Sequence, residues 1–213
     1  KMPSLSIPGA QRFVRYADHL ETLATLIKST GIEVEAFDGA REDSLFPTLP
    51  NEQQDSILTT LETYRRLVEA AANGGIDVRR GGSQMAWWTI RELGLRPPGD
   101  VFSLIGGEDV IEVYNAQSIQ IFRSFNFFQC SSYSLDEIYT HPWWELYDRY
   151  LAISKFMQSA VELLPQKGQP VATPSPFPRH NVTEKRGRRK ITTVIESSCT
   201  GSLHNSNGTL EGD

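Results

Sequence analysis

The chain of 213 residues is long enough for one large domain or two small ones with a buried core. Its formal net charge of -5 makes a nucleic-acid-binding role unlikely, because such proteins are usually basic, and no apolar run reaches the roughly 18 residues of a membrane span. Two cysteines are too few for a disulfide framework, and the N-terminus has no signal-peptide pattern, so we expect a cytoplasmic protein.

The first segment predicts an amphipathic helix followed by a strand. Apolar residues recur there at three- and four-residue spacing, which places them on one helical face. That face comprises Phe13, Tyr16, Leu20, Leu23, Ala24 and Ile27. Gly31 can end this helix. Ile32 to Phe37 alternates apolar and acidic residues and predicts a short strand, and Asp38 to Pro50 is expected to be irregular.

Two further helices are predicted before residue 95. The second begins at Asn51, which can cap it with Gln54 three residues on as in a capping box, and it ends at Asn73-Gly74-Gly75. The third fits Gln84 to Leu93. The sequence Arg96-Pro97-Pro98-Gly99 then breaks the helical pattern and marks a domain boundary.

The second half begins with strands and continues with short helices. Val110 to Tyr114 reads as one strand, and Ile119 to Phe128 reads as a second, because both are rich in β-branched and aromatic residues. Ser134 to Glu137 forms a capping box, which predicts a short helix. Pro142 suits the first turn of another short helix.

The last third predicts a helix, a linker and a hairpin. Tyr150 to Leu164 has the spacing of a longer amphipathic helix, and the five prolines of Pro165 to Pro178 predict an extended loop or linker. Lys190 to Cys199 alternates like a strand. Asn205 to Gly208 is a strong hairpin turn, after which Thr209-Leu210 begins a returning strand.

Three of these pieces together resemble the PAS family. The first piece is the pair of strands Asp109–Asn115 and Ile119–Phe128. The second is Tyr133-Ser-Leu-Asp-Glu-Ile138, which is similar to the start of the PAS helical segment, although a serine precedes it where the family usually has glycine. The third is Lys190–Ile195 leading to the turn in Asn205–Leu210.

The resemblance implies an α+β protein with a helical N-terminal region, residues 1–98, packed on a PAS-like antiparallel β-sheet with flanking helices, residues 99–213. The family has five strands, whereas this chain supplies four after Val101, so we expect either that the domain stops before its last strand or that a strand comes from elsewhere. The implied function is a sensory or regulatory module that binds a small ligand or a protein partner in signal transduction. We expect a homodimer that pairs through the N-terminal helices.

The family's pocket between sheet and helices implies a ligand site lined by large apolar side chains. The residues expected to line it are Phe122, Phe125, Phe128, Trp143, Trp144 and Met157. The alternative is that these side chains simply fill the core. Haem is disfavoured because Tyr150–Leu164 contains no histidine, and photoreactive flavin is disfavoured because Cys130 precedes the helical segment. We expect Cys130 to be a small buried hydrophobic residue, and the cofactor stays unknown.

We expect neither catalysis nor a metal site. The sequence has no Gly-x-Ser-x-Gly or P-loop pattern, and no two of its four histidines have metal-ligand spacing. The basic run Lys185–Lys190 is expected to be a solvated strand edge or loop, with binding of a phosphate, an acidic partner or nucleic acid as the alternative. The rival function is a ligand-free interaction and dimerisation domain of a transcriptional regulator. A packed interior with an exposed apolar patch would favour that rival, and an open cavity walled by Phe122, Phe125, Trp143 or Trp144 would favour the sensor.

Overall fold

The computed structural model describes residues 9–39, 41–79, 82–93, 106, 110, 112–114, 120–148, 171–174, 180–185, 191–194 and 197–200. These residues form an α+β arrangement. Its helices are α1 (Gly9–Lys28), η1 (Arg41–Asp43), η2 (Phe46–Thr48), α2 (Asn51–Asn73), α3 (Gly82–Glu92), α4 (Phe127–Cys130), α5 (Leu135–Thr140) and α6 (Trp143–Leu146). Its strands are β1 (Glu112–Tyr114), β2 (Gln120–Arg123), β3 (Tyr147–Asp148), β4 (Val171–Pro174), β5 (His180–Glu184), β6 (Ile191–Val194) and β7 (Ser197–Thr200). Within these ranges, no helix is both long and apolar enough to cross a membrane.

Helix α1 confirms the predicted amphipathic face. Six of its apolar residues are buried against the rest of the molecule, and they follow the expected three- and four-residue spacing. They are Tyr16, Ala17, Leu20, Leu23, Ala24 and Ile27. The helix gives way to a turn at Gly31, whose φ of 85° lies in the left-handed region that glycine adopts without a steric penalty.

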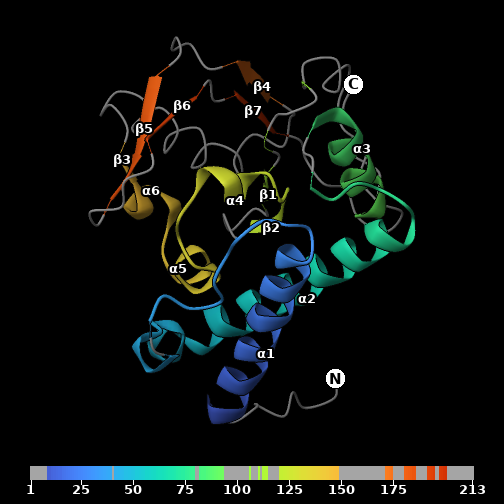
Figure 1. The fold of residues 1–213 in the computed structure, drawn as a ribbon. Coiled ribbons are helices and arrows are strands. Elements are labelled where there is room, and N and C mark those ends of the chain that lie inside the picture. The colour runs from blue at the N-terminus through green and yellow to red at the C-terminus, as the bar shows by residue number, and fades with distance from the viewer. Residues whose placement is uncertain are drawn as a thin grey trace.

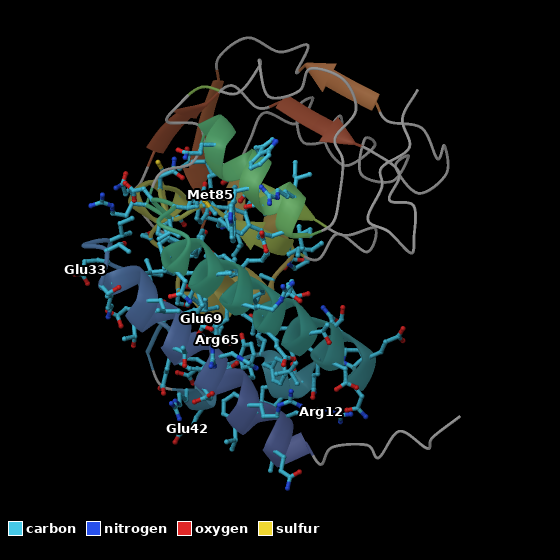
Figure 2. The ribbon with its side chains drawn as sticks, turned by 90° about the vertical axis from the view of Figure 1, so that its right-hand side faces the viewer. Arg12, Glu33, Glu42, Arg65, Glu69 and Met85 are labelled. Carbon is cyan, nitrogen blue, oxygen red and sulfur yellow. The ribbon has the colours of Figure 1, made fainter. Side chains whose placement is uncertain are left out.

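Helices α1 and α2 run in the same general direction and cross each other, as Figures 1 and 2 show. Arg12 near the start of α1 forms an ion pair with Asp55 near the start of α2. Farther along, Asp18 of α1 lies 3.9 Å from Arg65 of α2. Because both helices advance together, residues 29–50 must return to the starting end before α2 begins.

The capping box predicted at Asn51 is wrong. Pro50 occupies the cap position, and no side chain caps α2. The side-chain oxygen of Asn51 instead accepts a hydrogen bond from Arg12 at 3.0 Å, and the side-chain amide of Gln54 donates to the Leu49 carbonyl at 2.8 Å. A buried guanidinium from α1 therefore takes the acceptor that the cap would have used.

The strand predicted at Ile32–Phe37 is also wrong, although its alternating burial is right. Ile32, Val34 and Ala36 are buried while the two glutamates between them are exposed. The segment belongs to no strand, because two of its carbonyls serve a helix: the amides of Leu135 and Asp136 in α5 donate to the carbonyls of residues 35 and 36, each at 2.9 Å. These bonds satisfy amides that have no partner within α5.

The described strands form three separate small sheets, β1-β2, β3-β5-β6 and β4-β7. The strand predicted over Ile119–Phe128 ends at Arg123, and the chain then turns into α4. The strand predicted over Lys190–Cys199 is divided between β6, which pairs with β5, and β7, which pairs with β4 inside the expected proline-rich loop. The single sheet that the PAS resemblance implied, with this segment beside Ile119–Phe128, is thus not formed by the described residues. Alternation specifies an extended strand, but it does not specify a partner.

One hydrophobic core joins residues from both sides of the expected boundary at residue 98. Buried side chains of α1, α2 and α3 belong to the same cluster as those of β2, α4 and α5. Figure 1 shows α4, α5 and the β1-β2 pair between the crossed helices and the remaining strands. The helical region therefore packs on β2, α4 and α5, whereas the PAS-like sheet on which it was predicted to pack is not formed by the described residues. The boundary itself, the helix predicted at Tyr150–Leu164 and the turn predicted at Asn205–Gly208 lie outside the described residues.

Candidate functional site

Three of the six expected pocket residues come together in the structure. Phe122 on β2 and Phe125 are each only 1% exposed, and Phe128 on α4 packs 6.4 Å from Phe125 between ring centroids. Trp143 and Trp144 belong to α6, but their side chains, like the whole of Met157, are outside what the structure describes. The structure therefore places half of the predicted set in one aromatic cluster.

Tyr64 of α2 completes this cluster. Its ring meets Phe122 edge-on at 5.5 Å and Phe125 edge-on at 6.5 Å. Its buried hydroxyl donates a hydrogen bond to the Arg123 carbonyl at the end of β2. The sequence placed Tyr64 on the apolar stripe of α2, but no local signal paired it with residues about 60 positions later.

A buried arginine lies beside the aromatic cluster. Nη2 of Arg123 is 2.6 Å from Oε1 of Glu112, its cross-strand partner in the β1-β2 pair. The guanidinium also lies 3.5 Å from the centroid of the Phe127 ring. The carboxylate compensates part of the desolvation cost of the cation, and the ring face adds a cation–π attraction.

Tyr139 of α5 carries a buried hydroxyl without a hydrogen-bond partner in the described part of the chain. Burial raises the pKa of this hydroxyl well above its ordinary value, and the positive charge of Arg123 opposes that shift. A buried hydroxyl without a partner costs free energy, and a water molecule or a ligand commonly satisfies such a group.

Residues 131–137 form a polar segment, here called the joint, which contains the capping box predicted at Ser134. The Ser134 hydroxyl accepts from the Glu137 amide at 3.3 Å, and Oε2 of Glu137 accepts from the Ser134 amide at 3.0 Å. This reciprocal pair fixes the start of α5 within the joint. The sequence correctly predicted this local geometry, but it gave no sign of the two buried carboxylates that bind the joint.

The first carboxylate is Asp136, which connects α5 to the N-terminal helices. Its Oδ1 accepts a hydrogen bond from the hydroxyl of Tyr16 at 2.7 Å and another from the hydroxyl of Ser44 at 2.6 Å. The Tyr16 ring stacks on Phe46 with centroids 3.9 Å apart and planes 7° apart. Three segments far apart in the sequence thus converge on one oxygen atom.

The second carboxylate is Glu184 of β5, which binds the other end of the joint. Its Oε1 accepts from the hydroxyl of Ser131 at 3.1 Å and from the amide of Ser132 at 2.6 Å, and its Oε2 accepts from the hydroxyl of Ser132. The Tyr147 hydroxyl lies 3.0 Å from that of Ser131, and burial raises the pKa of Tyr147 to about 12. The joint is therefore bonded to β5 at one end and to α1 at the other.

The hydrogen bonds around the joint connect separate segments of the fold, and they offer little reactive chemistry. The hydroxyls of Ser131, Ser132 and Ser134 are all bonded to carboxylates. Within the described ranges there is no group of three or more His, Cys, Asp or Glu residues placed to hold a metal ion. Cys130 is exposed, so its expected burial is wrong.

No family model, curated protein or solved structure matches this chain.

Proposed function

We propose that this chain is a regulatory module that acts by binding a protein partner. The observation that carries the proposal is the packing of Tyr64 against Phe122 and Phe125. In a sensor with an open cavity, these two phenylalanine rings would face empty space or a ligand. Here α2 fills that space with a ring of its own, which supports a packed interior.

The partner we propose is a second copy of this chain, bound along the outer face of α1. Val14 is 67% exposed there, on the same face of the helix as Ala10, Gln11 and Arg15. Arg15 and Asp18 carry opposite charges beside Val14. If two copies of α1 pair in antiparallel orientation about a two-fold axis between residues 16 and 17, Arg15 of each copy faces Asp18 of the other. A two-fold interface needs such a self-complementary surface.

Native mass spectrometry tests the proposal. We expect the full chain to show the mass of a dimer and no retained small molecule. Val14→Asp adds a charge within this face and should yield a monomer. The matched control Gln53→Asp adds the same charge at an exposed position of α2 and should leave the dimer intact. A monomeric wild-type chain, or a dimer that survives Val14→Asp, would contradict the proposed partner.

A second candidate function, sensing of a small ligand, is favoured by the unsatisfied hydroxyl of Tyr139. A ligand with a hydrogen-bonding group would satisfy that hydroxyl. The same spectra distinguish the candidates, because a ligand adds a fixed mass under native conditions that disappears on denaturation. If such a mass is present in the wild-type chain and is lost in Tyr139→Phe, the sensor is supported and the ligand-free module is rejected.

A further inference from the structure

Asp136 holds an unusual place for a carboxylate. It is 7% exposed, and none of the ion pairs in the described part of the chain includes it. The two side-chain donors that reach it, Tyr16 and Ser44, are neutral hydroxyls. A buried charge without a cationic partner is costly. Ionisation of Asp136 therefore destabilises the docked structure relative to one in which the carboxylate reaches water.

Burial and the neighbouring groups determine the direction in which the pKa of Asp136 shifts. Burial raises the pKa of the carboxyl, and the negative charge of Glu137 adds to that shift. The hydrogen bonds from Ser44 and Tyr16 and the charge of His141 act in the opposite direction, but burial dominates. Tyr16, the titratable group that α1 presents to Asp136, has a pKa raised well above its ordinary value and stays protonated at neutral pH.

We propose that the first turn of α5 is a charge-controlled latch, docked tightly on α1 and residues 32–46 when Asp136 is neutral and loosened when Asp136 is ionised. Opening the latch lets the carboxylate reach water and breaks the bonds from the amides of Leu135 and Asp136 to the carbonyls of residues 35 and 36. Because Glu184 binds the same joint through Ser131 and Ser132, movement of α5 is passed to β5. This inference concerns the chain itself and does not depend on which partner it binds.

Hydrogen exchange of the full chain, followed by mass spectrometry between pH 4 and pH 8, tests the latch. Peptides that contain residues 132–141 report the Leu135 and Asp136 amides directly. After correction for the chemical exchange rate, we expect their protection to fall as pH rises. The fall is bounded at about tenfold per pH unit, the limit for one proton, within the interval between the ordinary and the raised pKa of Asp136.

Three variants separate the latch from general stability. Asp136→Asn keeps an acceptor oxygen for both hydroxyls but removes the charge, so its protection should no longer depend on pH. The matched control Asp148→Asn makes the same change at a carboxylate whose side chain is 69% exposed, and it should keep the wild-type pH dependence. His141→Gln should also keep that dependence, which excludes titration of the histidine as its source.

Ser44→Ala keeps the proposal testable if Asp136→Asn does not fold. Hydrogen bonds to an ionised acceptor are roughly twice as strong as those between neutral groups. Loss of the Ser44 hydroxyl should therefore lower the protection of α5 several-fold more at pH 8 than at pH 4. Wild-type protection that is flat across the pH range, or an equal loss at both pH values in Ser44→Ala, would overturn the latch.

Discussion

Replacement of Tyr64 by alanine should destabilise both halves of the described structure at once. The side chain is almost completely buried and meets Phe122 and Phe125 edge-on. Truncation of a buried aromatic residue to alanine typically costs about 3–5 kcal/mol, because transfer free energy is lost and a cavity remains. Tyr64→Phe keeps the ring and loses one hydrogen bond, so it should cost about 0.5–1.5 kcal/mol. For a chain of this size, 1 kcal/mol lowers Tm by roughly 2–4 °C.

Urea unfolding followed by far-ultraviolet circular dichroism and by tryptophan fluorescence provides the measurement. All four tryptophans lie after α2, at residues 87, 88, 143 and 144, so their fluorescence reports segments other than the mutated helix. We expect both signals to shift together in Tyr64→Ala. Trp87→Ala is the control, since that ring is 47% exposed and its contact with Arg91 is worth about 0.5–1 kcal/mol. A loss below about 1 kcal/mol in Tyr64→Ala, or a shift in only one signal, would refute the shared core.

Three further predictions concern single features of the structure. Ser134→Ala removes the capping hydroxyl of α5 and should lower the free energy of unfolding by about 1 kcal/mol, measured by urea titration. Gly31→Ala should lower the free energy of unfolding by about 1–2 kcal/mol, because φ is positive there although nothing crowds the new methyl group. Gly9→Ala is the control: the position is equally uncrowded and has no positive φ, so the substitution should cost nothing. Burial raises the pKa of four tyrosines, that of Tyr147 to about 12. Stability should therefore fall as pH rises above about 10, because the unfolded chain loses protons there that the folded chain retains. Titration of all tyrosines near pH 10 without unfolding would contradict this prediction.

The features that the sequence predicted correctly depend on residues within about one helical turn of each other. The buried face of α1 follows from its apolar spacing, and the start of α5 follows from the reciprocal bonds of Ser134 and Glu137. Each of these signals can be evaluated without knowledge of the rest of the chain. The position of α1 and the cap of α5 were therefore accessible before any tertiary structure was considered.

The features that it predicted wrongly depend on partners that are distant in the sequence. Asn51 has the right side chain for a cap, but Arg12 competes for the same oxygen from 39 positions away. Ile32–Phe37 has the right alternation for a strand, but its carbonyls bond to α5 about 100 residues later. Local pattern gives the conformation of such segments, and only the assembled fold determines where their hydrogen bonds go.

The candidate site shows the same division. The aromatic residues Phe122, Phe125 and Phe128 stand out in the sequence because large apolar side chains are conspicuous wherever they occur. Asp136 was visible only as an interior residue of the capping box, and Glu184 gave no signal at all. Their significance comes from burial and from donors 120 and 53 positions away, neither of which leaves a local trace.

The separation of 120 residues between Tyr16 and Asp136 also sets a delay during synthesis. A ribosome adds about 5–20 residues per second, so on the order of 6–24 s pass between translation of α1 and translation of the carboxylate that receives its tyrosine. Throughout that interval the aromatic face around Tyr16 and Phe46 lacks the helix that covers it. The nascent chain should accordingly be a chaperone client, and a transcript that ends before residue 136 should give an aggregation-prone product.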